Sequence, residues 1–150
     1  MDINEKALEE LIRKVIEKEL NISSDKESIK FIDKSGVGVV KAQKIKKERF
    51  DTGNPQDQVY VTDLYSLEES PRIGAGMMEM TKSAFDWTLN YDEIDYIIEG
   101  KLEIIVDGRK IVGEAGDVML IPKGSKIKFS APEYAKFVYV VYPANWQEQK

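Results

Sequence analysis

The residues best suited to chemistry are four acids that lie close together in the chain: Asp86, Asp92, Glu93 and Asp95. Alternate side chains of an extended strand share a face, so Glu93 and Asp95 should point to the same side. Neighbouring carboxylates repel, and the pKa of at least one should rise unless a cation lies between them. Such a cluster suits Mg²⁺, which prefers oxygen ligands, or a cationic substrate such as an amine. The alternative is structural: Asp92 caps a loop and Glu93 bonds to the backbone.

Positive and polar side chains that could bind an anionic group are also available. Lys123 is the leading cation, in the segment IPKGSK with Lys126, and Arg72 in SPRIGAG is another. A lysine in a turn, however, is more often only solvated. The further residues with which a ligand could interact are Asp86, Thr88, Tyr91, Tyr96, Ser125 and Tyr139. Single tyrosines in strands are more often part of a core or an interface.

Two missing residue types exclude several classes of enzyme. The chain contains no histidine and no cysteine. A Ser-His-Asp triad, a cysteine nucleophile, an iron–sulfur cluster and a zinc site built on His or Cys are therefore excluded within one chain. Disulfides are excluded too, which fits a reducing compartment and leads us to expect a cytoplasmic protein.

Charge and hydropathy argue against nucleic acid and membrane partners. The formal net charge is -5, whereas a nucleic-acid-binding protein needs a dominant basic surface. One basic run, Lys41 to Arg49, is better explained as a solvated strand edge than as a phosphate-binding patch. No window is long and apolar enough for a transmembrane span, and the N-terminus lacks the apolar region of a secretory signal.

The N-terminal part of the chain predicts an amphipathic helix over residues 2–20. Apolar residues recur there at spacings of three and four, and Asp2 can cap the helix with Glu5 in a capping box. The stretch NISSDKES then predicts a linker, so we expect residues 1–28 to form a helix and linker and residues 29–150 a domain. A helix of this length is marginal alone. It either packs on its own protein or a dimer mate, or docks on another protein.

The rest of the chain predicts an all-β fold. Residues 29–66 contain short strands and turns, with a loop at Gly53-Asn54-Pro55. Residues 73–142 alternate short apolar strands with turns: IGAGMMEM, DYIIEG, KLEIIVDG, DVMLIPKG, KIKFSAP and KFVYVVYP. Strands this short and regular indicate a sandwich or a barrel, and Asp107-Gly108 marks a tight hairpin. The phosphate-binding loop GxxxxGK[ST] is absent.

Two motifs resemble the cupin superfamily over roughly residues 40–142. Glu93 to Gly100 matches the E-x6-G half of the first cupin motif, and Gly116 to Gly124 matches the G-x5-P-x-G opening of the second. The resemblance implies a jelly-roll β-barrel, usually a homodimer, with Glu93 pointing into the barrel. The histidine positions of both motifs are different here: Trp87, Leu89 and Ile127 stand where ligands are expected. A His-based transition-metal site is therefore not expected.

Longer stretches resemble the ethanolamine-utilisation EutQ family of cupins. They are FDWTLNYDEIDYIIEGKLEI, GDVMLIPKGS and FVYVVYPANW. The resemblance implies a role in bacterial ethanolamine breakdown, in or beside a protein-shelled microcompartment. It also implies an acetate kinase with a small carboxylate substrate and Mg²⁺ with ATP, for which Glu93, Asp95 and Lys123 are the expected catalytic residues and Glu93 and Asp95 the magnesium ligands. Residues 1–20 resemble tags that attach cargo to shell proteins.

A second interpretation starts from the apolar residues at the lost ligand positions. Trp87, Leu89 and Ile127 would make a drier and partly filled cavity. That environment would raise the pKa of Glu93 and could keep it neutral. The protein would then be a non-catalytic assembly or ligand-binding component.

Overall fold

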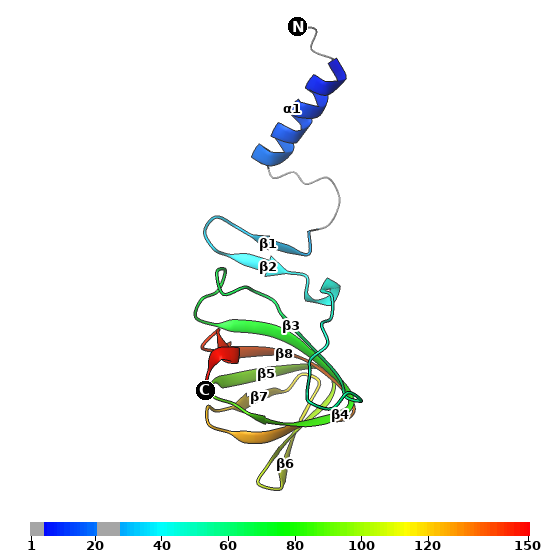
Figure 1. Cartoon of the computed structure of the whole chain (residues 1–150), viewed down its shortest axis with the longest axis vertical. Helices are drawn as coiled ribbons and strands as arrows, with labels where there is room; N and C mark the ends of the chain where they lie inside the picture. Colours follow the sequence, from blue (N-terminus) through cyan, green and yellow to red (C-terminus); the bar gives the residue numbers. More distant parts are fainter. Residues whose placement is uncertain (1–4, 21–27) are drawn as a thin grey trace. The chain divides into compact units, whose positions relative to one another are not determined.

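The computed structural model describes residues 5–20 and 28–150, and it divides the chain into two compact units, Met1–Lys41 and Ala42–Lys150. The first unit contains helix α1 (Glu5–Leu20) and a hairpin of strands β1 (Lys30–Ile32) and β2 (Gly38–Val40) (Figure 1). The predicted N-terminal helix is thus confirmed. Its expected cap at Asp2 and the predicted linker over 21–27 lie outside the described residues, and the domain boundary at residue 28 stays a prediction.

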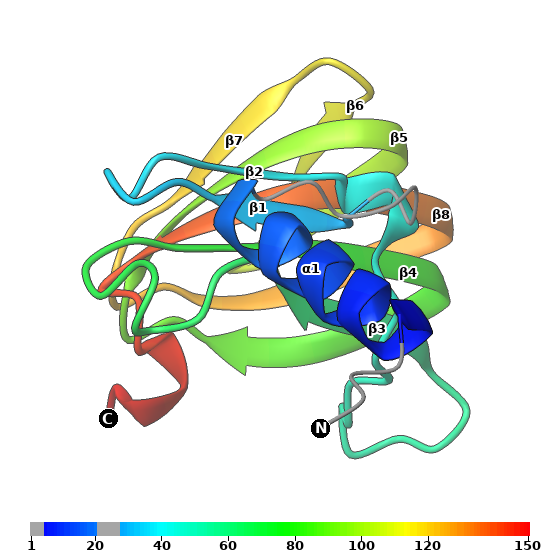
Figure 2. The same cartoon turned by 90° about the horizontal axis from the view of Figure 1, so that it is seen from above.

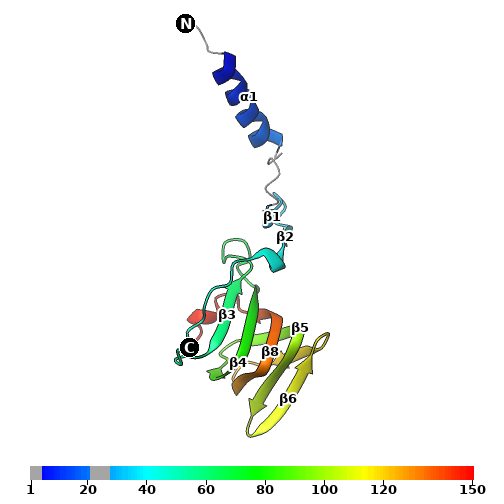
Figure 3. The same cartoon turned by 90° about the vertical axis from the view of Figure 1, so that its right-hand side faces the viewer.

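The second unit is a strongly bent antiparallel sheet. Its strands are β3 (Gln58–Asp63), β4 (Gly74–Thr88), β5 (Asp92–Val106), β6 (Arg109–Glu114), β7 (Val118–Ile121) and β8 (Lys126–Tyr142). They lie in the order β3-β4-β8-β5-β6 (Figure 3), and β7 pairs with β5. The long strands β4, β5 and β8 curve around a common interior (Figure 2). The short 3₁₀ helices η1 (Ala42–Lys44) and η2 (Trp146–Glu148) flank the sheet in the sequence. The predicted all-β fold is confirmed.

Two predicted turns prove to be irregularities within continuous strands. The segments 95–100 and 101–108 were predicted as separate strands, but β5 runs through Gly100. Gly100 has a φ of 75°, and a Cβ there would lie 2.1 Å from the carbonyl oxygen of Tyr134. Similarly, β8 continues through Pro132, where its pairing with β4 shifts register opposite Lys82. Glycine and proline therefore mark bulges here and not turns. The predicted hairpin at Asp107-Gly108 is confirmed, with positive φ at both residues.

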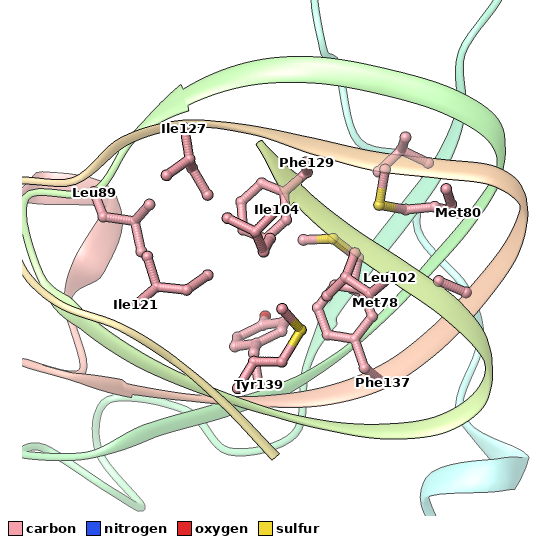
Figure 4. Packing of buried hydrophobic residues seen from close by; sticks show 14 of the residues in the cluster. Met78, Met80, Leu89, Leu102, Ile104, Ile121, Ile127, Phe129, Phe137 and Tyr139 are labelled. Carbon is pink, nitrogen blue, oxygen red and sulfur yellow. The ribbon is translucent and has the colours of Figure 1, made fainter. Parts of the chain in front are cut away.

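The hydrophobic core fills the interior of the bent sheet. Alternate residues of β4, β5 and β8 point inward and pack against one another (Figure 4). At one end Met80, Leu102 and Phe137 are almost completely buried. At the other end Leu89 and Ile127, which occupy two of the lost ligand positions, are buried as well. The positions that the cupin resemblance assigns to metal ligands at Leu89 and Ile127 therefore carry side chains that belong to the apolar core.

Candidate functional site

Strand β5 carries two buried carboxyl groups. Glu93 is 4% exposed and Asp95 is 0% exposed, whereas Ile94 and Tyr96 between and beside them are 45% and 49% exposed. The predicted alternation along this strand is therefore confirmed, and both acids point into the interior. Asp95 pairs in register with Met119 on β7 and with Tyr139 on β8. The two carboxyls thus lie among side chains that offer little solvation.

Burial changes the acidity of this pair. It raises the pKa of Glu93 from its usual 4.5 to about 7, an increase that interactions with Asp95 and Tyr91 partly offset. Burial, followed by the charge of Glu93, raises the pKa of Asp95 well above its usual range. The expectation that at least one pKa rises is confirmed. The pair therefore retains a proton near neutral pH, because two ionised carboxylates at this depth would repel without water to screen them.

Three carboxyl oxygens of the pair have no hydrogen-bond donor. They are Glu93 Oε1, Asp95 Oδ1 and Asp95 Oδ2. Ionised carboxylates only accept hydrogen bonds, so the two groups can bond to each other only when one carries a proton. Buried polar atoms without partners are rare in proteins, and each needs a physical reason. The expected alternative, in which Glu93 bonds to the backbone, is not what the structure shows for its Oε1.

An aromatic cavity opens beside Glu93. Its space for the centre of a water-sized sphere is about 20 Å³, and its walls are Phe50, Val61, Met78, Phe85, Trp87, Tyr91, Glu93, Phe129, Tyr139 and Trp146. Trp146, from the C-terminal η2, packs edge-on against Trp87 and Tyr139 and tilted against Tyr91. Glu93 is the only charged residue among these walls. The cavity is thus small and mainly aromatic, and the carboxyl of Glu93 forms part of its wall.

Two tyrosines of the cavity are held by specific hydrogen bonds. Trp87 Nε1 donates to the Tyr91 hydroxyl at 2.8 Å, and the Tyr139 hydroxyl donates to Asp63 Oδ1 at 2.6 Å. Tyr139 reaches Asp63 across Gly76, where a Cβ would come within 2.0 Å of the tyrosine ring. Burial is the largest cause that raises the pKa of both tyrosines. Both hydroxyls therefore stay protonated at physiological pH.

A larger hollow shares part of the same walls. It has about 520 Å³ of space for the centre of a water-sized sphere, and it is lined by Phe50, Trp87, Thr88, Asn90, Tyr91, Trp146, Gln147 and Gln149. Asn90 Nδ2 donates to the carbonyl oxygen of Gln149 at 3.3 Å, which joins the β4–β5 loop to the C-terminal segment. We call this hollow the vestibule. Its polar side chains contrast with the apolar inner cavity, so the vestibule is the better place for a polar substrate.

The structure brings together only some of the predicted site residues. Tyr91, Glu93 and Tyr139 line the cavity, Asp95 lies beside Glu93, and Thr88 lines the vestibule. Tyr96 instead points outward from β5, and Asp86 is exposed on β4, where it pairs with Lys128 at 3.6 Å. Of the four acids predicted to form one cluster, only Glu93 and Asp95 lie together in the interior.

The loop between β7 and β8 positions the remaining predicted residues. The backbone N–H of Lys123 donates to Asp92 Oδ1 at 2.8 Å, so Asp92 caps this loop, as the structural alternative predicted. Ser125 Oγ donates to the carbonyl oxygen of Pro122 at 2.6 Å, and its own carbonyl accepts from the N–H of Leu89. Lys123 itself is exposed. The loop is therefore bonded to Leu89, which directly follows Thr88, and its lysine side chain is exposed at the surface.

Several residues of the site could not be found from the sequence. Asp63, Phe50 and Trp146 come from segments far from β5 in the chain. No motif marks Asp63 or Phe50, and Trp146 lies in the stretch FVYVVYPANW without being marked as a site residue. Gly76 gives a weak signal, because glycine inside a strand often marks a close approach. Among the residues that the structure describes, no three Asp or Glu side chains gather as a metal-binding group.

Comparison with known proteins identifies the family. The family model described as "Ethanolamine utilisation protein EutQ" matches residues 3–148. The chain belongs to the EutQ family. This confirms the resemblance that the motifs around Glu93 and Gly116 indicated. No helix in the described ranges 5–20 and 28–150 has the length and apolar character to span a membrane.

Relatives of this EutQ family member include a protein named "Acetate kinase EutQ" from Clostridioides difficile. The two are 52% identical over 154 residues, which cover 99% of this chain and 97% of the relative. A solved structure of the Clostridium difficile EutQ protein matches with a TM-score of 0.79 and 56% identity, over 81% of this chain and 91% of that one. The cupin domain of Schizosaccharomyces pombe Cnp3, 16% identical, matches with a TM-score of 0.56 over 74% of this chain and 80% of that one. This last likeness shows the fold alone.

Proposed function

We propose that this EutQ family member is an acetate kinase. In the proposed reaction a carboxylate oxygen of acetate attacks the γ-phosphorus of ATP. A new O–P bond forms while the bond between the γ-phosphorus and the bridging oxygen of ADP breaks. The products are acetyl phosphate and ADP, and no proton needs to be removed from acetate, which is already ionised at neutral pH.

The observation that carries this proposal is the match to the Clostridioides difficile acetate kinase. It extends over 99% of this chain and 97% of the relative. It therefore includes the whole bent sheet and the C-terminal η2, whose Trp146 lines the cavity. The vestibule adds physical support. It is the larger of the two hollows that meet at Trp87 and Tyr91, and it presents the amide side chains of Asn90, Gln147 and Gln149 to a polar ligand.

Lys123 is the proposed source of positive charge. It lies on the loop whose residue Ser125 is bonded to Leu89, next to the vestibule residue Thr88. Lys126, the first residue of β8, pairs in register with Thr88. Phosphoryl transfer is mainly a matter of positioning and of stabilising charge on the transferred group, and exposed lysines at this edge can contribute to both.

The expected magnesium site on Glu93 and Asp95 does not fit the geometry. Carboxylate oxygens are suitable donors, but Mg²⁺ requires octahedral coordination and usually keeps several waters. The space beside Glu93 is about 20 Å³, enough for about one water, and the other walls are mostly aromatic. We therefore propose that Mg²⁺ reaches the protein on the phosphates of ATP and not on these two carboxylates.

The activity is tested by trapping its product. The full chain is mixed with acetate, ATP and MgCl₂, and acetyl phosphate is converted by hydroxylamine to a coloured hydroxamate. We expect product from the wild type and about 10- to 100-fold less from Lys123→Ala if it stabilises the transferred group. The exposed Lys110, on β6, provides the matched control Lys110→Ala. Absence of product from the folded wild type would remove the proposal. A comparison of Glu93→Gln and Asp95→Asn with wild type tests their predicted catalytic role.

We also propose that the protein is a homodimer. The outer face of the sheet carries large exposed apolar residues, namely Ile94, Tyr96, Val118, Leu120, Val140 and Tyr142. Ile94 pairs in register with Leu120 and Val140, so these side chains form one continuous patch. Contiguous exposed patches of this kind are typical of interfaces. In sedimentation velocity we expect a dimer for wild type and a monomer for Ile94→Lys. A monomeric wild type would contradict the proposal.

The proposed location is a bacterial microcompartment in the cytoplasm, reached through α1. Within the described part of the helix, Leu8, Leu11, Ile12, Val15 and Ile16 have the spacing of one apolar face. The test uses the full chain fused to a fluorescent protein in cells that form shells. We expect shell-associated signal for wild type and diffuse signal for a Leu11→Asp, Val15→Asp double variant, with the exposed Lys14→Ala as control. Diffuse wild-type signal would indicate that the helix packs elsewhere.

A further inference from the structure

The proposed kinase reaction does not use the three carboxyl oxygens of Glu93 and Asp95 that lack a hydrogen-bond donor. Glu93 lines the inner cavity at 4% exposure, and its Oε1 has no donor. Asp95, at 0% exposure, interacts directly with Glu93 and leaves both of its oxygens without a donor. Leaving such groups unpaired costs the full penalty of their desolvation. A ligand that supplies donors and positive charge would remove this penalty.

The walls of the cavity restrict what that ligand is. Trp87, Tyr91, Tyr139 and Trp146 surround the space beside Glu93 with aromatic rings. Aromatic faces attract cations that shed their water, such as an ammonium group. A hydrated divalent metal ion would lose its water there without gaining the six oxygen ligands that it needs. The space of about 20 Å³ admits a group of the size of a water molecule, which an ammonium head also has.

A primary ammonium group and the buried carboxyl pair are also complementary in the number and type of their hydrogen-bonding atoms. A primary ammonium carries three N–H donors and no acceptor. The buried pair offers unpartnered acceptors and no free donor besides its shared proton. Tyr139 does not compete for this position, because its hydroxyl donates to Asp63. The Tyr91 hydroxyl accepts from Trp87 and interacts with Glu93, but Glu93 Oε1 still has no donor. One positive charge would balance the single negative charge of a pair that retains one proton.

We propose that the inner cavity is a binding site for a small primary ammonium ion, held by Glu93 and enclosed by Trp87, Tyr91, Tyr139 and Trp146, with Asp95 as the buried acid that interacts with Glu93. This inference concerns binding alone and does not rest on the kinase activity. A protein that makes no acetyl phosphate can still bind the ion, and an active kinase can fail to bind it.

The chain offers a direct optical probe of this site. It contains two tryptophans, and both line the cavity. Full-length protein is titrated with methylammonium chloride at constant ionic strength while the tryptophan emission is recorded, without ATP and acetate. We expect a saturable change in emission. Equal concentrations of NaCl and MgCl₂ should give no saturable change, because neither ion supplies N–H donors.

Isosteric variants test the role of the acids. Glu93→Gln should weaken methylammonium binding by at least about tenfold, since it removes a charge-assisted hydrogen bond. Asp95→Asn should also weaken binding, since it removes the acid that interacts with Glu93. Glu99→Gln is the matched control, because Glu99 is an exposed acid on the same strand, and its binding should equal that of wild type. Circular dichroism verifies that each variant is folded, and calorimetric titration of the wild type provides a second measurement that does not depend on tryptophan.

Three results would overturn the proposal. The first is the absence of saturable binding to the folded wild type by both methods. The second is equal binding by Glu93→Gln, which would place the ion elsewhere. The third is an equal response to Na⁺ or Mg²⁺, which would show that the cavity detects charge and not an ammonium group.

Discussion

The two ends of the sheet's interior are built from different chemistry. Around Phe137, Met80 and Leu102 the buried side chains are apolar and packed together (Figure 4). The region near Trp146 instead holds the buried carboxyl of Glu93, with which Asp95 interacts. The first end stabilises the fold through hydrophobic burial. The carboxyls at the second end lower the stability of the fold, because buried acids without hydrogen-bond partners destabilise the folded state. This contrast indicates that the apolar end stabilises the sheet, whereas the end with the carboxyls is available to bind a ligand.

The largest effect should come from the packed end. Phe137→Ala removes a completely buried ring from strand β8 and should lower the free energy of unfolding by about 3–5 kcal/mol. Urea denaturation followed by circular dichroism measures this. A loss below about 1 kcal/mol would show that the packed end does not carry the stability of the fold.

A smaller effect, with a pH dependence, should come from the acidic end. The pKa of Glu93 is raised by burial from 4.5 to about 7, so the folded state holds its proton more tightly than the unfolded state. The stability that this proton provides is complete below about pH 4.5 and is lost as the pH rises to about 7. Glu93→Gln cannot ionise. Relative to wild type it should therefore gain about 3 kcal/mol of stability across this range.

The measurement is a set of urea denaturation curves of both proteins at several pH values. Glu99→Gln serves as the control, since Glu99 is exposed on the same strand and its pH dependence should follow the wild type. A difference between Glu93→Gln and wild type that stays constant with pH would contradict the buried position of Glu93.

An effect of about 1 kcal/mol should come from the hydrogen bond across Gly76. Tyr139→Phe keeps the ring but removes the hydroxyl that donates to Asp63 at 2.6 Å. Asp63 is exposed and can be solvated by water, so the loss should stay near that of an ordinary hydrogen bond. Thermal unfolding measures it. If Asp63→Asn and the double variant do not show coupling with Tyr139→Phe, the hydrogen bond does not stabilise the cavity wall.

The smallest effect should come from the surface. Asp86→Ala removes an ion pair with Lys128 whose side chains are 84% and 42% exposed, and it should change stability by less than about 0.5 kcal/mol. Its tryptophan emission and methylammonium binding should equal those of wild type, because Asp86 lies outside the cavity. A clear loss of methylammonium binding would show that Asp86 belongs to the binding site, and it would contradict the distinction between the interior acids and the surface acid.

Local sequence determined much of this protein. The alternation of Glu93, Ile94, Asp95 and Tyr96 along one strand fixed which of them face inward, because the period of a strand is two residues. The hairpin at Asp107-Gly108 followed from the residues that tolerate positive φ. The two motifs around Glu93 and Gly116 indicated the cupin sheet and the EutQ family. These features depend on neighbours in the chain, so they can be read without knowing the rest of the fold.

Only the tertiary structure decided the content of the cavity. Phe50 and Trp146 line it from segments far from β5, and Asp63 bonds to its wall residue Tyr139. Asp86, close to Glu93 in the chain, lies outside it. The continuity of β5 through Gly100 likewise depends on how closely Tyr134 approaches from β8. Burial, pKa and the lack of a donor are properties of the space around a group. They arise when strands distant in the sequence pack together, so no local pattern of residues determines them.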